Sequence, residues 1–482
     1  MDNTKKEQES ISLKPERLPS RENFIEWYNA LLYLAGIADK SYPVKGTFVW
    51  LPYGLRIMKK LVAFFDEKFR ECGIEEVLFP LFINMDFAKQ NDKWFESFKN
   101  EAFYIEGKEL LLRPTGEPAM YPIFKSWISQ GKLPIRIYET VCSYRNESKT
   151  THTLIRDREI SFWHEIHTAH KTRAESVEEA RKHKTIYEQV WSDVLNIPSI
   201  VVAKPQYEIF AGADSAFEFY IILPDGRLLE NGSINNLGQA YAKKFDLYYT
   251  NEKGEKEYVW QVCTGNGGRF LAAVIAVHGD SNGLVLPPKV APISVVVVPI
   301  FKSGKSENVI KEAGELKELL VKAGISVFVD YSDSTPGEKF NVWELKGAPI
   351  RVEIGEREIA ERAYTVFRRD SNKKSKVEKF RIVEAVELLL NKEIPAGLMS
   401  NATKVYKDKI CPAGSLDQAK GLISTGKVIK ANWCEKQECF DAISAIAPSV
   451  ESIGTLANEE HSGKCISCGQ QTNKLTLIGR TY

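Results

Sequence analysis

Two stretches of the chain place arginines where they can bind an anion. In the first, residues 264–269 read TGNGGR, and Arg269 follows three glycines and opens an apolar helical pattern. The amide groups at the start of a helix bind anions, and a guanidinium stays charged and matches phosphate oxygens. The stretch lacks the lysine of a P-loop and the strand–helix–strand setting of a dinucleotide fingerprint. It therefore indicates either a phosphate site of another kind or a glycine turn with a surface arginine.

The second stretch, at 139–170, reads as two strands joined by a polar loop. Arg145 and Glu147 end the first strand, and Arg156 begins the next strand after the loop. Convergent arginines each bridge two phosphate oxygens and suit a triphosphate, whereas a glutamate such as Glu147 accepts a hydrogen bond from an adenine amino group. A salt-bridged hairpin on the surface is the alternative interpretation.

Four cysteines near the C-terminus have the spacing of a metal site. Cys434 and Cys439 enclose four residues, and Cys465 and Cys468 enclose two. Four thiolates in two short pairs suit tetrahedral Zn²⁺ with no open position, which is typical of structural zinc. The sequence therefore predicts a structural zinc site, and the alternative is four unrelated thiols.

The elements that carry these residues fall into three regions. Residues 21–290 begin with an amphipathic helix at 53–73 and continue with strands whose wide spacing predicts a largely antiparallel sheet. Prolines and a change of composition follow, and strands alternating with helices predict a small α/β domain at 291–395. The pattern changes again, so residues 400–482 form a third region that carries the four cysteines. Residues 1–20 are polar and are expected to be a disordered extension.

The overall composition limits the possible classes of protein. The chain has 482 residues, 43% of them hydrophobic and 27% charged, and a formal net charge of +1. These values are ordinary for a globular protein, and a nucleic-acid partner would have to meet a local basic patch. No run of about 18 apolar residues and no secretory signal is apparent, so we expect a cytoplasmic protein that does not enter a membrane.

Five motifs along the chain resemble those of one family. They are RPTGE at 113–117, YRNESKTTHTLIRDREI at 144–160, PDGR and NNLGQAYAKKFD within 224–246, RFLAAVIAVHGD at 269–280, and PGEKFNVWELKGAPIRVEIG at 336–355. Over about residues 24–482 the chain resembles the class II aminoacyl-tRNA synthetases, and among them the prolyl-tRNA synthetases of the archaeal and eukaryotic type. The resemblance implies an α+β protein with a class II antiparallel-sheet catalytic domain, an α/β anticodon-binding domain and a small zinc-binding C-terminal α+β domain.

The same resemblance implies a reaction and its partners. Proline would be activated with ATP and Mg²⁺ as an aminoacyl-adenylate and then passed to the 3′ end of tRNA(Pro). A homodimer is expected to form through the first long helix and the strand after it. In-line displacement at phosphorus needs positioning and charge neutralisation rather than a nucleophilic side chain, and no Ser–His–Asp set is apparent in the sequence.

Roles at single positions are also implied by the resemblance. Arg145 and Arg269 are expected to act on the reacting phosphate. The implied ATP-binding residues are Arg145, Glu147, Arg156, Glu230, Gln239 and Arg269. The implied amino-acid-binding residues are Thr115, Glu117, Arg145, Phe162, Trp163, Glu165, His167, Ser233, Asn235, Cys263 and Gly265. The implied tRNA-binding residues are Lys339, Glu344, Lys346 and Arg351. For His167, a hydrogen-bonded histidine of the core is the alternative.

The chain departs from the family pattern around the expected amino-acid pocket. Glu230 stands where the family has glutamine, and Asn235 stands where it has histidine. Residues 263–269, CTGNGGR, replace C-x-G-x-S-x-R or S-W-G-x-S/T-x-R. Smaller wall residues favour a larger or differently shaped ligand, because an unfilled cavity is costly. The carboxylate of Glu230 is also a suitable ligand for Mg²⁺.

Three functions are therefore compatible with the sequence. The first is a divergent prolyl-tRNA synthetase, which the intact arginines and RPTGE favour. The second is a paralogue that activates a proline analogue or another amino acid, for tRNA or for a different acceptor. The third is a catalytically silent, synthetase-like regulator that binds tRNA or a partner. Pyrophosphate exchange with a range of amino acids distinguishes the three.

Overall fold

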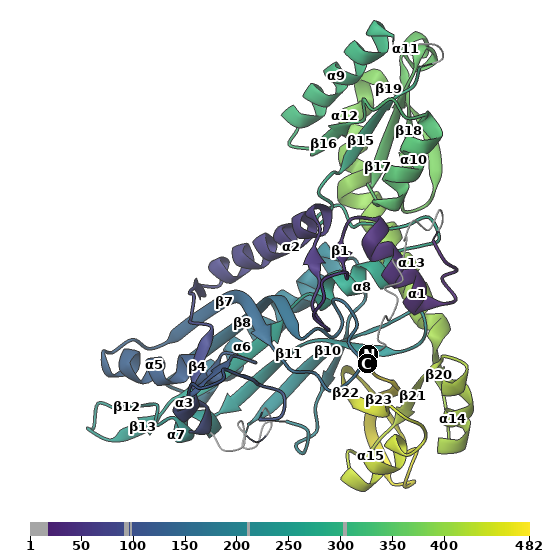
Figure 1. Ribbon diagram of the computed structural model, residues 1–482. Helices are drawn as coiled ribbons and strands as arrows, with labels where there is room; N and C mark the ends of the chain where they lie inside the picture. Colours follow the sequence, from purple (N-terminus) through teal and green to yellow (C-terminus); the bar gives the residue numbers. More distant parts are fainter. Residues whose placement is uncertain (1–17, 91–95, 97–98, 210–212, 302–305) are drawn as a thin grey trace, which may run out of the picture.

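The structure is a computed structural model that describes residues 18–482 apart from 91–95, 97–98, 210–212 and 302–305. Nearly all of the predicted extension at 1–20 lies outside the described residues. Figure 1 shows a wide catalytic region, an α/β region above it and a smaller C-terminal region below it.

One large sheet runs through the catalytic and C-terminal regions. Its strand order is β20-β21-β23-β22-β9-β10-β11-β14-β8-β7-β3, and neighbouring strands from β9 to β7 are antiparallel, as the sequence predicts. The strands of the catalytic region are β3 Glu75–Glu76, β7 Ile135–Tyr144, β8 Glu159–His170, β9 Ile200–Ala203, β10 Ser215–Ile222, β11 Leu228–Gly238 and β14 Trp260–Asn266.

Helices pack on both faces of this sheet, against apolar residues that alternate along its strands. The helices of the region are α1 Phe24–Leu34, α2 Pro52–Glu71, α3 Met85–Lys89, α5 Glu117–Ser129, α6 Arg173–Gln189, π-helical η1 Val190–Val194, α7 Ala240–Lys244 and α8 Arg269–His278. The predicted helix at 53–73 is α2, and its Phe65 lies 5.0 Å from Phe270 of α8 and 5.6 Å from Tyr187 of α6, between ring centroids. His164 of β8 joins this aromatic cluster, so the neighbouring residues Trp163 and Glu165 point to the opposite face.

Shorter strands complete the catalytic region. They are β1 Ala38–Asp39, β2 Val49–Trp50, β4 Phe82–Asn84, β5 Phe103–Tyr104, β6 Leu110–Leu112, β12 Tyr248–Thr250 and β13 Lys256–Tyr258. Pro80 separates β3 from β4, because proline cannot donate to a strand ladder. The segment after the first long helix therefore forms two short strands, of which β3 lies at the edge of the large sheet.

The predicted α/β region is a separate five-stranded sheet with helices packed against it. Its order is β16-β15-β17-β18-β19, with β15 parallel to β16 and β17. The elements are β15 Val295–Pro299, α9 Glu307–Lys322, β16 Val327–Val329, α10 Pro336–Leu345, β17 Ile350–Ile354, α11 Glu356–Glu361, β18 Ala363–Arg368, β19 Lys373–Glu378, η2 Lys379–Arg381, α12 Ile382–Leu388 and η3 Leu389–Glu393. Every residue of β15 is buried, as its continuous valine run predicts.

The C-terminal region extends the catalytic sheet. Thr455 of β22 pairs with Ala203 of β9, which joins the two regions through the strand ladder. Helix α13, Ile394–Lys409, spans the boundary that we expect between 395 and 400. The other elements are β20 Ile410–Pro412, α14 Leu416–Ser424, β21 Val428–Asn432, α15 Gln437–Ser444, β22 Val450–Lys464 and β23 Gln471–Arg480. No helix in the described part of the chain combines the length and apolarity needed to cross a bilayer.

Candidate active site

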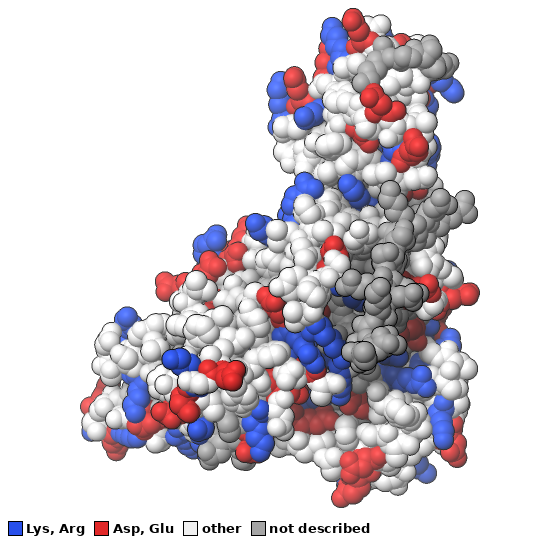
Figure 2. All heavy atoms as spheres, in the orientation of Figure 1, with Lys and Arg blue, Asp and Glu red and all other residues white. Residues whose placement is uncertain are grey.

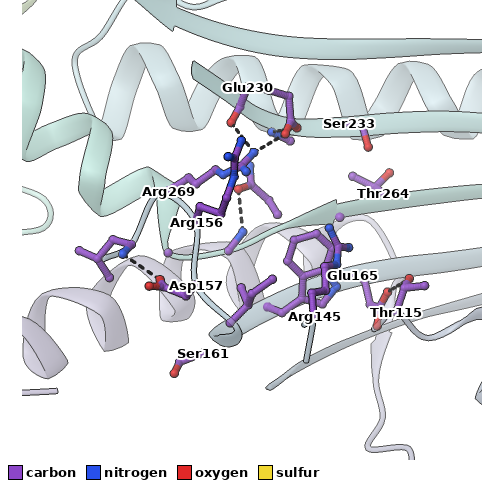
Figure 3. A pocket seen from close by; sticks show the side chains of 18 of the residues that line it. Thr115, Arg145, Arg156, Asp157, Ser161, Glu165, Glu230, Ser233, Thr264 and Arg269 are labelled. Atoms are coloured by element: carbon purple, nitrogen blue, oxygen red, sulfur yellow. Dashed lines mark hydrogen bonds and ion pairs between the residues drawn. The ribbon is translucent and has the colours of Figure 1, made fainter. Parts of the chain in front are cut away.

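A cavity on the face opposite the aromatic cluster brings together most of the residues predicted to bind substrates (Figure 3). Its walls come from β8, β11 and β14, from the start of α5 and α8, and from the loop between β7 and β8. Fourteen predicted residues line it: Thr115, Glu117, Arg145, Glu147, Arg156, Trp163, Glu165, His167, Glu230, Ser233, Asn235, Cys263, Gly265 and Arg269.

Strand register explains how residues far apart in the sequence meet in this cavity. In one row across the sheet, Ser233 pairs with Gly265, and Gly265 pairs with Glu165. In the next row, Asn235 pairs with Cys263, and Cys263 pairs with His167. Directly paired residues of antiparallel strands point to the same face, so both rows face the cavity.

The inner end of the cavity is suited to a cation. Thr115 Oγ1 lies 2.6 Å from Oε2 of Glu117 and 3.1 Å from Oε2 of Glu165, and the Gly116 amide donates to the same Glu165 oxygen at 3.1 Å. Glu117 and Glu165 are only 4% and 2% exposed, and burial raises the pKa of Glu117 above its ordinary value. A bound ammonium group would compensate these two buried carboxylates.

His167 also lies at this inner end of the cavity, as a buried and hydrogen-bonded histidine that lines the wall. It lines the cavity, and its Nδ1 and Nε2 lie 3.1 Å from the Tyr121 hydroxyl and 3.3 Å from Oε2 of Glu165. Burial opposes ionisation of both groups, but their mutual hydrogen bond and charge outweigh it. They lower the pKa of Glu165 to about 2 and raise the pKa of His167.

Trp163 and Arg145 form the middle of the cavity wall. The Arg145 guanidinium carbon lies 5.1 Å from the centre of the indole ring, and Arg145 Nε donates to the Pro114 carbonyl at 3.2 Å. A Cβ placed on Gly265 would lie 2.7 Å from Cζ2 of Trp163, and one on Gly267 would lie 3.3 Å from its Cε3. The indole lies against both glycines, so the missing side chain at Gly267, where the family pattern has serine or threonine, does not by itself enlarge the cavity. The altered ligand shape stays a prediction.

The outer end of the cavity gathers positive charge. Arg269 is the first residue of α8, as the helical pattern predicts, and its Nε donates to the Ile155 carbonyl at 2.8 Å. Arg156 comes from the same loop as Ile155, and its Nε lies 3.9 Å from Oε2 of Glu147. Burial and the neighbouring charge of Arg269 lower the pKa of Arg145. Like charges held close together have this effect, and a bound anion would relieve their repulsion. Figure 2 shows basic side chains gathered on this face, with acidic ones beside them.

Two predicted residues lie outside the cavity. The Gln239 side chain donates to the Tyr258 carbonyl at 2.7 Å, so it ties the end of β11 to β13. Phe162 has a φ of 56° at a bulge, where the register passes from Val141–Trp163 to Ser143–Ile160. The extra residue of the bulge turns Phe162 toward Trp50, at 5.4 Å between ring centroids, while Trp163 keeps its place in the cavity.

Several cavity residues are not predicted from the sequence. They are Phe48, Trp50, Asp157, Ser161 and Glu218, among others. Glu218 is paired with Ser233 across β10 and β11, and it accepts a hydrogen bond from the Tyr220 hydroxyl at 2.7 Å. A glutamate within the apolar run FEFYIIL is unusual, and this feature could have identified Glu218 as a cavity residue from the sequence.

The predicted tRNA-binding residues are mostly engaged within the α/β region. Lys339 is 2% exposed and donates to the Asp330 carbonyl at 2.9 Å. Arg351 is 3% exposed and pairs with Glu344 at 2.7 Å and with Glu353 at 3.1 Å. Lys339 and Arg351 therefore organise the domain rather than face a ligand. Lys346, over the Trp343 ring at 5.2 Å, is partly exposed and stays a predicted tRNA contact.

The four C-terminal cysteines converge as a metal site requires. The ligand atoms of Cys434, Cys439, Cys465 and Cys468 all lie within 4.8 Å of one another. Cys434 Sγ is 3.5 Å from Cys439 Sγ and 3.7 Å from Cys468 Sγ. A tetrahedron with Zn–S bonds of about 2.3 Å has S–S edges of about 3.8 Å, so this donor set fits zinc.

Comparison with known proteins identifies the family. The model for the class II tRNA synthetase core domain (G, H, P, S and T) matches residues 98–278, and the anticodon binding domain matches 294–392. The model for the prolyl-tRNA synthetase C-terminal domain matches 416–482. Proline–tRNA ligase of Methanopyrus kandleri is 38% identical over 96% of both chains, and that of Thermococcus kodakarensis is 38% identical over 97% of this chain and 99% of its own. The chain belongs to the prolyl-tRNA synthetase family.

Solved structures of this family agree with the fold over nearly the whole chain. Prolyl-tRNA synthetase from Cryptosporidium parvum, complexed with halofuginone and AMPPNP, has a TM-score of 0.91 at 30% identity and covers 96% of this chain and 99% of its own. The Giardia lamblia enzyme in complex with prolyl-adenylate has a TM-score of 0.91 at 29% identity and covers 97% and 99%. The class II core and the anticodon-binding domain that the sequence predicts are thus confirmed.

Proposed function

We propose that the protein activates proline with ATP and transfers it to the 3′ end of tRNA(Pro). The observation that supports this most is a single cavity, in a member of this family, with a buried two-carboxylate cation site at one end, Arg145 in the middle and two arginines at the other end. An amino acid lies naturally across such a cavity, with its ammonium group at the inner end and its carboxylate toward Arg145.

The proposed mechanism follows from this placement. Glu117, Thr115 and Glu165 hold the amino group, and Arg145 aligns the carboxylate with the α-phosphate of ATP. A carboxylate oxygen attacks the α-phosphorus, the bond to the β-phosphate oxygen breaks, and pyrophosphate leaves beside Arg156 and Arg269. A terminal hydroxyl of tRNA then attacks the acyl carbon, AMP leaves, and the hydroxyl proton is released. Each step needs aligned groups and fixed charge, which this cavity supplies.

We also propose that ATP is used with Mg²⁺. Glu230 and Glu147 line the nucleotide end of the cavity, and carboxylates together with phosphate oxygens are the ligands that Mg²⁺ prefers. When bound, the ion would neutralise part of the phosphate charge.

Pyrophosphate exchange into ATP tests the proposed function. We expect exchange with proline and charging of tRNA(Pro). Asn235 favours the paralogue as a second candidate, because its amide, which donates to Ser233 Oγ at 3.1 Å, replaces an imidazole of the family pattern. Exchange with a ring analogue of proline but not with proline would establish that candidate. Exchange with none of the amino acids would favour the silent regulator.

The cysteine cluster is proposed to hold a structural Zn²⁺. Metal analysis of the purified protein should find about one zinc ion per chain, because four thiolates in this geometry leave no open position. Cys468→Ser should lose the metal and lower the melting temperature, since zinc binding contributes to folding. Cys411→Ser is the matched control, because Cys411 lies on β20 outside the cluster. Full zinc retention in Cys468→Ser would contradict the proposal.

A homodimer is proposed through the first long helix, α2, and the extended segment that follows it, residues 75–84. Large apolar side chains are exposed there, including Leu78 at 80% and Phe82 at 54%. Burying such residues against a second copy would remove them from water. Leu78→Asp should shift the mass measured by light scattering from two chains to one, whereas Val177→Asp, on an exposed apolar residue of α6, should not. A monomeric wild-type protein would overturn this proposal. The expected cytoplasmic location stays a prediction.

A further inference from the structure

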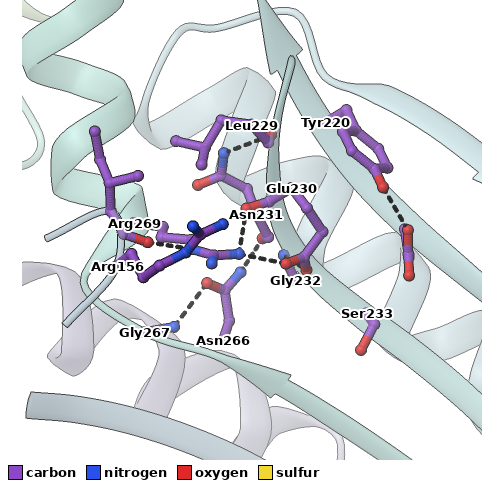
Figure 4. Close-up of polar contacts among 12 residues, drawn as sticks. Arg156, Tyr220, Leu229, Glu230, Asn231, Gly232, Ser233, Asn266, Gly267 and Arg269 are labelled. Atoms are coloured by element: carbon purple, nitrogen blue, oxygen red, sulfur yellow. Dashed lines mark hydrogen bonds and ion pairs between the residues drawn. The ribbon is translucent and has the colours of Figure 1, made fainter. Parts of the chain in front are cut away.

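Glu230 holds Arg269 at the nucleotide end of the cavity through both its backbone and its side chain (Figure 4). Arg269 Nη1 donates to the Glu230 carbonyl at 2.9 Å and also pairs with the carboxylate oxygen Oε2. The other carboxylate oxygen, Oε1, accepts the Gly232 amide at 2.7 Å. The side chains of the pair are 30% and 33% exposed, so both still reach the cavity.

This arrangement places a negative charge where phosphates are proposed to bind. The three arginines face a polyanion, but the Glu230 carboxylate already neutralises one of them. A triphosphate that approaches Arg269 therefore competes with Glu230 for the same guanidinium and is repelled by its charge. A glutamine at this position has one acceptor oxygen, so its side chain would keep only one of these two hydrogen bonds and would carry no charge to repel the phosphates.

We infer that Glu230 makes nucleotide binding depend on a divalent cation, by leaving Arg269 for the cation when the nucleotide binds. The Arg269 guanidinium stays in place through its Nε contact with the Ile155 carbonyl and its Nη1 contact with the Glu230 carbonyl, and it loses only the Glu230 carboxylate, so its charge becomes available to the phosphates. A divalent cation held by the Glu230 carboxylate would neutralise its charge, so the carboxylate would no longer repel the phosphates. Glu230 is thus a positioning residue for Arg269 without nucleotide and a cation ligand with it. The inference rests on the proposed ATP site.

The test is the equilibrium affinity for AMPPNP, measured by calorimetry in excess EDTA and again in excess Mg²⁺. In the wild type we expect weak binding in EDTA and much tighter binding with Mg²⁺. In Glu230→Gln we expect binding in EDTA to become about tenfold tighter, since one charge-assisted pair no longer competes. The dissociation constant in EDTA divided by that in Mg²⁺ should therefore fall by about tenfold or more.

Two further variants make the result specific. Glu218→Gln removes another carboxylate of the same cavity, one that pairs with Lys204 at 3.4 Å and with Tyr220 instead of Arg269, and it should keep the wild-type ratio. Glu230→Asp keeps the charge and should keep most of the cation dependence. This variant also tests the inference if Glu230→Gln does not fold.

The outcomes separate this inference from the proposed function. A wild-type ratio in Glu230→Gln, or a fall of the ratio in Glu218→Gln equal to that in Glu230→Gln, would overturn the role of Glu230 and leave the ATP site standing. Failure of the wild type to bind AMPPNP under either condition would instead overturn the proposed function. A ratio in Glu230→Asp as low as in Glu230→Gln would show that charge at this position is not what matters.

Discussion

Replacing Arg269 with alanine is expected to lower the rate of adenylate formation by about 10²-fold or more. The guanidinium is fixed before substrate arrives, by the Ile155 carbonyl at 2.8 Å and the Glu230 carbonyl at 2.9 Å. A charge that is already aligned stabilises the departing pyrophosphate without reorganisation, which is where such groups have their largest effect. The measurement is pyrophosphate exchange at saturating proline and ATP.

The pairing of Arg269 with Glu230 means that removing Arg269 also changes the charge that faces the phosphates. In Arg269→Ala the Glu230 carboxylate is left facing the phosphates, so part of the loss is repulsion and not the missing guanidinium. The double variant with Glu230→Gln should recover part of the activity, and the difference measures the coupling between the two residues. Arg173→Ala is the matched control, because Arg173 pairs with Asp214 at 2.7 Å on the exposed surface of α6. An Arg269→Ala rate within about twofold of the wild type would show that Arg269 is not a phosphate ligand.

Local pattern was sufficient to predict the elements that position this site. The spacing of apolar residues predicts α2, and the valine run predicts β15. The stretch around Arg145 and Arg156 predicts two strands joined by a polar loop, and β7 and β8 form that hairpin. These features depend on residues close together in the chain, where periodicity and turn chemistry act directly.

The errors arise where distant residues decide the outcome. Phe162 follows the strand pattern, but a bulge with one extra residue sends its side chain away from the cavity. The family resemblance implies that Lys339 and Arg351 bind tRNA, yet they lie inside the α/β region against Asp330, Glu344 and Glu353. Burial of a paired charge depends on tertiary neighbours, which a single sequence does not display.

The glycines of TGNGGR show both a feature that the local sequence predicts and one that distant residues decide. Their place before a helix with Arg269 at its start follows from the sequence alone. What they make room for does not, because Trp163 reaches them from β8, a strand about 100 residues earlier in the chain that pairs with β14. The glycines therefore determine how this wall of the cavity is packed, and in the proposed amino-acid pocket a change there should alter recognition of the amino acid.

Replacing Gly265 with alanine is expected to raise KM for the amino acid by about 10- to 100-fold. The added methyl group would lie 2.7 Å from Cζ2 and 3.2 Å from Cη2 of Trp163, closer than atoms approach in folded proteins. Trp163 and Arg145 both line the cavity, and the Arg145 guanidinium carbon lies 5.1 Å from the centre of the indole ring. A shift of the indole away from the new methyl group would therefore change the wall of the cavity and disturb the position of Arg145.

The comparison of two glycines makes this prediction specific. A Cβ on Gly268 would lie 3.4 Å from Leu154 Cδ2, which is an ordinary contact, so Gly268→Ala should leave KM for the amino acid nearly unchanged. KM for ATP should change little in Gly265→Ala, because Arg156 and Arg269 are held by contacts that do not involve Trp163. If Gly265→Ala instead raised KM for ATP alone, or left both constants unchanged, Trp163 would not be the wall of the amino-acid pocket. A selective loss of amino-acid affinity would show that Gly265 acts on recognition of the amino acid through the position of one indole ring.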